Sequence, residues 1–410
     1  MNPKIILFEA KEMQLLLTKY RRYLHTHPEI GFDLNQTIEY VKNELISMGY
    51  KPIQCGKCGL VALAGRKSSG KTFLIRADMD ALPISEQTEI DFASKNTEKM
   101  HACGHDLHTA MLLGAAKILK KYESKINGTV KLMFQPAEET LEGAKDMINA
   151  GILANPKVDA ALMIHAALCM PLPTGSAIIC DGGVSAPAAD YFEIKIQGKG
   201  CHGAMPELGI DPITIASHIV IALQELHARE LAMSDDSVLT IGTIQSGNAN
   251  NIIPDTAVLC GTLRAYDENV RQHLKIRLVE ISKGIAKTFR GAADVTFTSG
   301  CPTLFNDVKV SAGITKYCKE LLGESMAFSQ SDLKSLTPSS SKATKAVGSE
   351  DFAYISHQVP SVMLALASGN SKNGCLYPLH HPKVTFDEDA LAIGSSIYAY
   401  TAMRWLEEHF

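Results

Sequence analysis

The chain has 410 residues, of which 46% are hydrophobic and 20% charged, and its formal net charge is -4. A single hydrophobic core rarely grows beyond about 250–300 residues, so this length predicts two domains. The slightly acidic balance argues against a nucleic-acid partner, which selects a basic surface. No apolar run is long enough to span a bilayer. Glu9 interrupts the short apolar run Ile5–Phe8 and no small-residue cleavage site follows, which argues against a signal peptide.

Ten cysteines are scattered along the chain rather than concentrated in a small region. This usage is typical of reduced thiols and predicts a cytoplasmic protein. Cys55 and Cys58 have the spacing of a redox pair. However, they lie where a strand is expected to begin, whereas a reactive pair of that type needs a helix N-terminus. Ordinary thiols are therefore the favoured interpretation of both.

Helix and strand patterns alternate over the first third of the chain. Apolar residues at helical spacing are followed by short continuous apolar runs of strand length. The expected order is helix 8–25, helix 37–48, strand 72–75, helix 109–122, strand 130–134, helix 142–152 and strand 159–164. This order predicts an α/β catalytic domain with a mixed, mostly parallel sheet, whose first part covers residues 1–186.

Acidic and imidazole side chains follow three of these strands. Asp78 and Asp80 come after the first, Glu138 and Glu139 after the second, and His165 after the third. Ligands of open α/β sheets bind beyond the carboxyl ends of the strands. We therefore expect all five side chains at one edge of the sheet.

Two short segments carry residues suited to metal chemistry. Residues 100–109 read Met-His-Ala-Cys-Gly-His-Asp-Leu-His-Thr, which places Cys103 two residues from His105. A thiolate and an imidazole so close together indicate a metal site. In Gln-Pro-Ala-Glu-Glu at 135–139, adjacent glutamates can supply one metal ligand and one general base. Each group alone could be a buried thiol, a core histidine or a solvated charge, but together they favour metal-assisted hydrolysis.

The pattern changes after Pro187. The expected order is strand 191–197, helix 212–228, strands 238–245 and 256–266, a helix from Asp267 to about 289, and strand 295–297. This β-α-β-β-α-β order predicts a ferredoxin-like α+β module inserted over residues 187–300. The α/β pattern resumes over 301–410, the second part of the catalytic domain. Within it, the Ser-rich segment 329–345 is expected to be a surface loop.

Eight short motifs occur together in one order along the chain. They are Leu-His-Thr-His-Pro-Glu at 24–29, Arg-Ala-Asp-Met-Asp-Ala-Leu-Pro at 76–83, Met-His-Ala-Cys-Gly-His-Asp at 100–106, Gln-Pro-Ala-Glu-Glu at 135–139, Asn-Ile-Ile-Pro at 251–254, Gly-Thr-Leu-Arg at 261–264, Gly-Ser-Glu-Asp-Phe at 348–352 and Leu-His-His-Pro at 379–382. With them the chain resembles, over nearly its full length, the amidohydrolase branch of the dinuclear metallopeptidase and aminoacylase family. That branch includes hippurate hydrolases, N-acyl-amino-acid deacylases and auxin-conjugate hydrolases. The resemblance implies a catalytic α/β domain interrupted by a ferredoxin-like lid and dimerisation domain.

The resemblance also implies a set of site residues. It makes Glu138 the general base and Asp80 a carboxylate that orients a metal ligand. The implied metal ligands are Cys103, His105, Glu139, His165 and His380. His381 is an alternative to His380, although position in the motif favours His380. The implied cofactor is two divalent metal ions per subunit, zinc or manganese, with cobalt or nickel also compatible with these ligands.

The inserted domain carries three further candidates. By resemblance, His202 reaches the active site of a neighbouring subunit in a homodimer and polarises the scissile carbonyl. Asn251 and Arg264 hold the carboxylate of the substrate, for which the arginine fork is well shaped. The alternatives are an exposed histidine without a role and an arginine paired with a surface acid. Where family members usually have a second glycine before the lid histidine, this chain has Cys201, which leaves substrate details open.

These residues favour one reaction over two alternatives. The leading hypothesis is metal-dependent hydrolysis of the amide bond of small N-acyl amino acids, such as acetyl or benzoyl derivatives, giving a carboxylic acid and a free amino acid. A dipeptidase or aminopeptidase of the same family would need an extra acidic group for the free α-amine, and none is evident. A noncatalytic metal-binding dimeric module is disfavoured by the presence of Glu138 beside the ligands.

Overall fold

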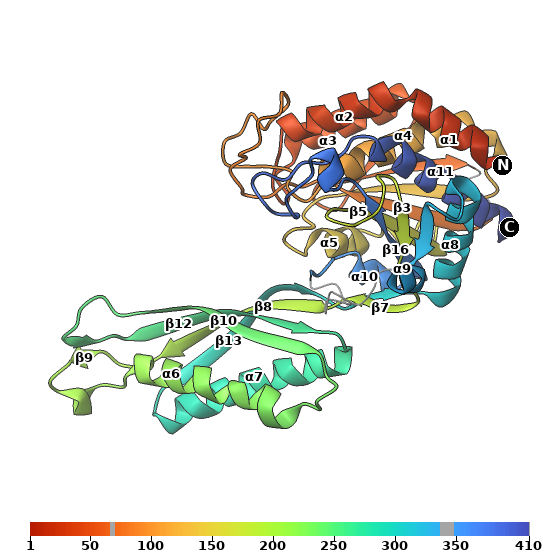
Figure 1. The fold of residues 1–410 in the computed structure, drawn as a ribbon. Coiled ribbons are helices and arrows are strands. Elements are labelled where there is room, and N and C mark those ends of the chain that lie inside the picture. Colours follow the sequence, from red (N-terminus) through yellow and green to blue (C-terminus); the bar gives the residue numbers. More distant parts are fainter. Residues whose placement is uncertain (66–69, 337–347, 410) are drawn as a thin grey trace. The chain divides into compact units, whose positions relative to one another are not determined.

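The computed structural model describes residues 1–65, 70–336 and 348–409, and the chain forms two compact units (Figure 1). The first unit comprises Met1–Ser185, Phe305–Thr344 and Asp351–Phe410. The second comprises Ala186–Leu304 and Lys345–Glu350. The insert predicted from the sequence covers residues 187–300. Each unit has its own hydrophobic core.

The first unit is built on an eight-stranded sheet with the order β1-β2-β4-β3-β5-β16-β6-β15. Its strands are β1 (Ile53–Cys55), β2 (Gly59–Gly65), β3 (Thr72–Asp78), β4 (Thr129–Gln135), β5 (Ala160–Ala167), β6 (Ala177–Ile179), β15 (Ala327–Ser329) and β16 (Ser361–Ala367). The central strands β4, β3, β5 and β16 are parallel neighbours, and β15 is parallel to β6. The pairs β1–β2, β2–β4 and β16–β6 are antiparallel. The sheet is thus mixed and mostly parallel, as the sequence predicts.

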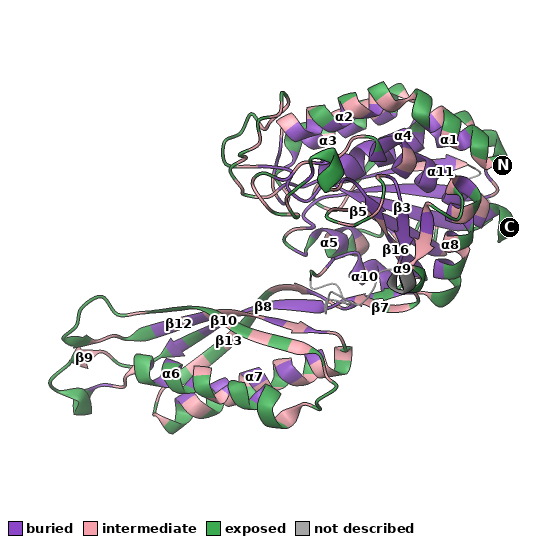
Figure 2. Ribbon diagram, viewed as in Figure 1, coloured by how far each residue is buried: buried purple, intermediate pink, exposed green. Residues whose placement is uncertain are grey.

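Helices cover both faces of this sheet. They are α1 (Pro3–Glu12), α2 (Gln14–Thr26), α3 (Asn35–Ser47), α4 (His105–Lys121), α5 (Gly143–Asn149), α8 (Val308–Leu322), α9 (Gln330–Leu336), α10 (Ala353–Ser356) and α11 (Ala390–Glu408), with short 3-10 turns at Glu123–Lys125 and Ser371–Asn373. The apolar helices α4 and α11 pack together on one face, and α5 and α10 lie on the other (Figure 1). Every residue of β3 and of β4 is therefore buried (Figure 2). Burial on two faces explains why these strands read as apolar runs rather than alternating ones.

Four details of the first unit differ from the sequence prediction. The first expected helix is broken at Met13 into α1 and α2, and α4 begins at His105, four residues earlier than expected. Strand β5 continues past His165 to Ala167. Part of the segment expected to be a Ser-rich loop forms α9, Gln330–Leu336. The rest of that segment, 337–345, lies outside the described residues.

The second unit is a four-stranded antiparallel sheet with two helices on one face. Its strands are β8 (Ala188–Gln197), β10 (Ser237–Ser246), β12 (Thr256–Ala265) and β13 (Ala292–Cys301), and its helices are α6 (Pro212–Ala222) and α7 (Glu268–Thr288). The sheet order is β10-β12-β8-β13. With the chain order β8-α6-β10-β12-α7-β13, this is the predicted ferredoxin-like arrangement. Asp267 begins α7 by accepting hydrogen bonds from the backbone of Asn269 and Val270.

Smaller elements complete the described chain. In the second unit these are the strand pair β9 (Cys201–His202) and β11 (Ile252–Ile253), a 3-10 turn at Pro206–Leu208 and a π-helical turn at Leu226–Glu230. Strands β7 (Gly183–Ala186) and β14 (Leu304–Asn306) pair where the chain leaves and re-enters the first unit. Within the described residues, no helix has the length and apolar character needed to cross a membrane.

Candidate metal centre and active site

Three neighbouring strands bring polar side chains to one edge of the first unit. Strands β4, β3 and β5 are adjacent and parallel. Asp80 follows the end of β3, the pair Glu138–Glu139 follows the end of β4, and His165 lies two residues before the end of β5. Because the carboxyl ends of parallel strands meet at one edge, these side chains converge there.

The start of α4 adds two more groups at this edge. Gly104 precedes the helix in a left-handed conformation with φ of +89°. A Cβ at this position would lie 3.1 Å from the Cβ of Ala166 and 3.2 Å from the ring of Phe386. Both the backbone conformation and the close approach therefore require glycine. The turn places buried Cys103 and His105 on either side of this contact with β5.

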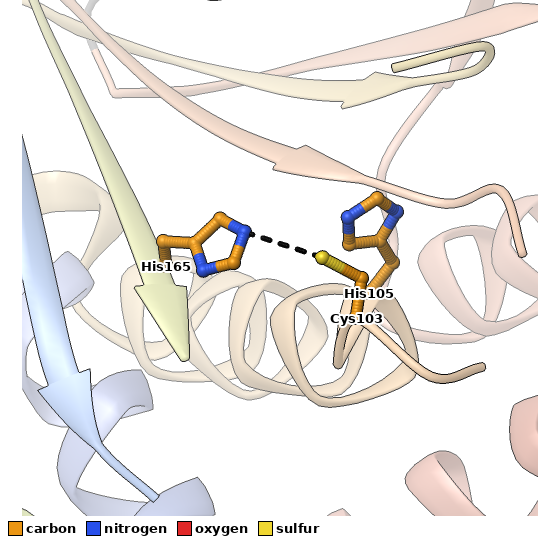
Figure 3. Close-up of side chains that lie close together, drawn as sticks. All are labelled: Cys103, His105 and His165. Carbon is orange, nitrogen blue, oxygen red and sulfur yellow. Dashed lines mark hydrogen bonds between the residues drawn. The ribbon is translucent and has the colours of Figure 1, made fainter. Parts of the chain in front are cut away.

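The Cys103 sulfur lies beside two histidines from distant segments. It is 3.6 Å from Nε2 of His165 and 3.2 Å from Nε2 of His380. In Figure 3 the ring of His165 and the side chain of Cys103 point toward one another, with His105 on the other side of the sulfur. His381 instead accepts a hydrogen bond from the Lys383 backbone at Nδ1 and stacks on a tyrosine ring. The structure thus brings His380, and not His381, to the thiol.

His105 and Glu139 present buried ligand atoms that lack hydrogen bonds. Nε2 of His105 lies 3.8 Å from Oε1 of Glu139 and 3.9 Å from Oε2 of Glu138. Neither Nε2 of His105 nor Oε1 of Glu139 has a hydrogen-bond partner within the described part of the chain. Donors bound to one ion at about 2.0–2.3 Å can lie up to about 4.6 Å apart. A divalent cation between these atoms would satisfy both, so the residues fit a metal.

The candidate ligands form overlapping groups. Among the described residues, five sets of side chains have ligand atoms that all lie within 4.8 Å of one another, and three of them are relevant here: Cys103, His105 and His165; Cys103, Glu139 and His380; and His105, Glu138 and Glu139. Cys103 belongs to two of these sets and Glu139 to two. Shared members of this kind would suit a site for two ions. The thiolate suits zinc, whereas the imidazoles and carboxylates accept several divalent metals.

Asp80 holds the two glutamates and His105 in place. Its two carboxylate oxygens accept hydrogen bonds from the backbone of Glu138 at 3.0 Å and of Glu139 at 3.2 Å. Its backbone oxygen lies 2.8 Å from Nδ1 of His105, which leaves Nε2 facing the cluster. Asp80 thus acts on the site through other residues rather than by contributing a free carboxylate.

Two side chains absent from the sequence-based set shape the end of β5. Strand β3 pairs with β5 only from Phe73 to Arg76, and beyond that point the two strands separate. The backbone N–H of Ile164 then donates to the hydroxyl of Tyr398 at 3.0 Å, and that hydroxyl donates to the Arg76 carbonyl at 2.6 Å. The backbone N–H of Ala166 donates to Nε2 of His108 at 2.7 Å. These contacts replace the missing ladder bonds on either side of His165.

Both ring nitrogens of His108 have hydrogen-bond partners. Its Nδ1 lies 2.6 Å from Oδ1 of Asp78, whose Oδ2 accepts from Arg76 at 2.7 Å. Both ring nitrogens are therefore engaged, so His108 is a support and not an available ligand. Its spacing from His105, three residues on one helix, is the sequence signal that could have placed it on the same face. Asp106 likewise faces away from the cluster, toward Arg21 and His25, each at 2.8 Å.

Burial perturbs the titration of the cluster. Burial raises the pKa of the Glu139 carboxyl to about 7, and the charges of Asp80 and Asp78 add to this, against the opposing effect of His105. Burial also raises the pKa of the Cys103 thiol, with Glu139 adding to it. Burial and then the charge of His108 lower the pKa of His165 to about 3, which leaves its ring neutral and able to coordinate.

The remaining predicted residues, His202, Asn251 and Arg264, lie in the second unit. His202 is exposed on β9, where its Nδ1 accepts from the backbone of Ala204 at 3.1 Å. A neutral ring then carries its proton on Nε2, which makes that atom a donor. The Asn251 carbonyl accepts from the Gly203 backbone at 2.7 Å, so His202 and Asn251 are neighbours. The Arg264 guanidinium lies 5.4 Å from the centre of the Tyr191 ring.

Arg264 lies at the other end of the second unit from His202 and Asn251. Along the β12–β8 pair, Arg264 is opposite Ala189 and Thr256 is opposite Gln197. Eight residues at about 3.3 Å each separate these two pairs by about 26 Å. The β9 strand lies beyond the Gln197 end (Figure 1). Within one chain, these two groups therefore cannot grip the same small substrate.

The fold and the cluster are those of a metal-dependent hydrolase, and comparisons with known proteins identify the family. The chain belongs to peptidase family M20/M25/M40, whose family model matches residues 74–404. Within that family, the relatives support its assignment as a metal-dependent amidohydrolase.

Similar curated proteins carry more than one activity in their names. The chain is 37% identical to IAA-amino acid hydrolase ILR1-like 2 of Arabidopsis thaliana, over 96% of this chain and 85% of the relative. It is 35% identical to N-acetyl-L-cysteine deacetylase of Bacillus subtilis, over 95% and 88%. It is also 35% identical to thermostable carboxypeptidase 1 of Saccharolobus solfataricus, over 97% of both chains. All three names describe hydrolytic enzymes, but the names differ in the substrate.

Solved structures agree with the fold. A putative aminohydrolase from methicillin-resistant Staphylococcus aureus matches with a TM-score of 0.87 at 31% identity, over 99% of this chain and 100% of that chain. A dinuclear metal-binding peptidase of the M20 family from Bacillus subtilis matches with a TM-score of 0.76 at 31% identity, over 97% and 99%. The second name supports a two-metal site in this family.

Proposed function

We propose that this protein hydrolyses the amide bond of N-acyl amino acids to a carboxylic acid and a free amino acid. The observation that carries the proposal is the arrangement of Glu138 and Glu139. The Asp80 carboxylate accepts hydrogen bonds from both backbones. Oε1 of Glu139 lies 3.8 Å from Nε2 of His105, and neither atom has a hydrogen-bond partner among the described residues. This geometry supports one glutamate as a metal ligand and its neighbour as a base. The deacetylase and IAA-amino acid hydrolase relatives support the substrate class.

Five side chains would hold the metal ions. They are Cys103, His105, Glu139, His165 and His380, whose donor atoms suit zinc or manganese. When bound, the ions polarise the scissile carbonyl and lower the pKa of the attacking water to about 7. Glu138, buried at the same edge of the sheet, takes the proton of this water and returns it to the leaving amine. Asp80 keeps Glu138 in position for both transfers.

The second unit would complete the site in a homodimer. Its edge strand β10 exposes Val238 and Ile244, each by 56%, and α6 exposes Ile221 by 69%. An exposed strand edge with apolar side chains favours pairing with another chain. Because Arg264 lies about 26 Å from the end of β12 beyond which His202 lies, one of the two would act on a substrate bound by the partner subunit. His202 would donate its Nε2 proton to the developing oxyanion, and Arg264 or Asn251 would bind the carboxylate.

The carboxypeptidase relatives support a second candidate, hydrolysis of short peptides by the same chemistry. A substrate panel separates the two. Purified protein loaded with zinc or with manganese is assayed for release of the free amino acid from acetyl, benzoyl and indole-acetyl amino acids and from dipeptides. We expect acyl amino acids to have the highest kcat/KM. Faster turnover of dipeptides would select the second candidate, and no turnover with either metal would indicate a noncatalytic metal-binding module.

All ten cysteines are free thiols in the structure. This supports a reducing compartment, and we therefore place the protein in the cytoplasm.

A further inference from the structure

A cavity of about 660 Å³ opens in the first unit between two loops. One loop, Cys169–Thr174, follows β5, and the other, Asn370–Leu376, follows β16. Strands β5 and β16 are parallel and paired at Ala167 and Ala367, so both loops leave the same edge of the sheet as the metal cluster. This volume lies within the range of small-molecule pockets, about 300–1,000 Å³.

The cavity is linked through both loops to candidate metal ligands. Cys169 comes four residues after His165, and Leu376 comes four residues before His380. Four residues span at most about 14 Å, so each wall begins within that distance of a histidine at Cys103. The backbone N–H of His380 donates to the Ala102 carbonyl at 2.9 Å, which anchors the second loop beside the cluster. A substrate whose carbonyl reaches the metals therefore has this cavity within reach of its remaining parts.

The two walls are tied together before any ligand binds. The side-chain amide of Asn370 donates to the Leu172 carbonyl at 2.9 Å, and that of Asn373 donates to the Thr174 hydroxyl at 3.0 Å. The Thr174 hydroxyl in turn donates to Asp387 at 2.6 Å. A cavity held open in this way loses little freedom when it is filled, which favours binding.

Over the part of the chain that the structure describes, the lining is mainly apolar and includes no carboxylate side chain. Met170, Leu172, Leu376 and two prolines are five of the twelve lining residues, and Lys372 is the one charged residue among the described lining. Leu376 is 62% exposed to solvent. No acidic side chain of the described lining is therefore available to pair with the α-ammonium of a peptide. Methionine adapts to different shapes, so a range of apolar groups would fit.

We infer that this cavity is the subsite for the acyl group and that it selects apolar acyl groups larger than acetyl. The inference rests on the proposed function. It assigns the acyl moiety to the segments 169–174 and 370–376 and makes Leu376 a specificity-determining residue. The amino acid part of the substrate then lies outside this cavity.

The test compares two substrate series on the metal-loaded enzyme. The first varies the acyl group on one amino acid, from acetyl to hexanoyl to phenylacetyl. The second keeps acetyl and varies the amino acid among alanine, leucine and phenylalanine. Leu376→Ser should lower the ratio of kcat/KM for hexanoyl over acetyl by about tenfold, since a lost apolar contact changes discrimination by about 10–200-fold. Leu376→Trp, which fills the cavity, should lower the same ratio for phenylacetyl.

Leu15→Ser is the matched control, because Leu15 is an exposed leucine of α2, 87% exposed and not part of the cavity lining. It should leave every ratio unchanged. A Leu376 effect on the amino acid series rather than the acyl series would overturn the inference, as would equal effects on both. Calorimetry adds a readout without turnover: hexanoate should bind the metal-loaded wild type more tightly than Leu376→Ser, and equal affinities would contradict the subsite. Absence of hydrolysis of every acyl amino acid by the wild type would instead overturn the proposed function itself.

Discussion

Nε2 of His105 and Oε1 of Glu139 lie 3.8 Å apart, both buried and both without a hydrogen bond within the described residues. A buried polar atom left unpaired costs about 1–3 kcal/mol, so two that face each other fit a shared cation. This position supports the proposed role of Glu139 as a metal ligand and leaves the base to Glu138 in the proposed mechanism. Glu138→Ala should lower kcat by about 10²–10⁴-fold, and the protein should retain its metal.

The matched variant of that experiment is Glu139→Ala, which should lose both activity and metal. Elemental analysis after gel filtration reports the metal content of each protein. Equal loss of metal in the two variants would contradict the separate roles of the two glutamates.

Tyr398 should control metal retention without touching the metal. Tyr398→Phe removes the hydroxyl that joins Ile164 to Arg76 and leaves a buried N–H unpaired next to His165. We expect a loss of about 1–3 kcal/mol in the free energy of unfolding, with weaker metal binding in addition. Tyr317→Phe is the control. The Tyr317 hydroxyl donates to Glu408, and among the described residues no hydrogen bond joins it to a candidate metal ligand. If both variants lower stability but neither changes metal affinity, Tyr398 is structural only.

Mixing two inactive chains tests whether His202 acts across a dimer. Glu138→Ala and His202→Ala each remove one group of the proposed site. If the groups come from different subunits, a hybrid dimer holds one site with both groups intact, so activity should return on mixing. Sedimentation reports the dimer. A fully active monomer would refute the shared site, and a proven hybrid without recovered activity would place His202 in its own subunit's site or outside the mechanism.

Lys131 gives a pH dependence of stability. Its ammonium is buried on β4 and donates to the carbonyls of Ile152 and Pro156. Burial lowers the pKa of Lys131 to about 8, whereas the unfolded value is about 10.4. Between these values the unfolded chain holds a proton that the folded chain lacks, so this lysine's contribution to stability rises with pH and is constant below about 8.

Urea unfolding of the wild type and of Lys131→Met from pH 7.5 to 10 isolates this contribution, since other groups cancel in the difference. The wild type should gain stability relative to the variant as pH rises, by on the order of 2 kcal/mol. A difference that stays constant over the range would show that Lys131 keeps its proton on folding.

The sequence predicted most of this fold because its signals are local. Continuous apolar runs give β3 and β4, and the residues after each run, Asp80 and Glu138, lie at the predicted edge. The order of elements after Pro187 gives the ferredoxin-like sheet, since each strand and helix has its own period.

What the sequence missed depends on contacts between distant segments. Helix α4 begins at His105 because Gly104 forms a left-handed turn there. No side chain caps this helix, so the sequence has no capping residue from which its start could be predicted. The role of His108 follows from the separation of β3 and β5, which no single segment encodes. His380 was favoured over His381 by its position in the motif, but the loop that brings it to Cys103, in which His380 has φ of +64°, could not be predicted. The separation of His202 from Arg264 along the second unit becomes visible only from the register in which β12 pairs with β8.

The most direct measurement of the central claim is a metal titration of the stripped enzyme. Protein freed of metal with a chelator is titrated with zinc or manganese, while release of the free amino acid from an N-acyl amino acid is followed. We predict no turnover before metal is added and a plateau near two equivalents per chain, a ratio in keeping with the dinuclear M20 relative. Full turnover by the metal-free protein, or no turnover at any metal content, would contradict the account.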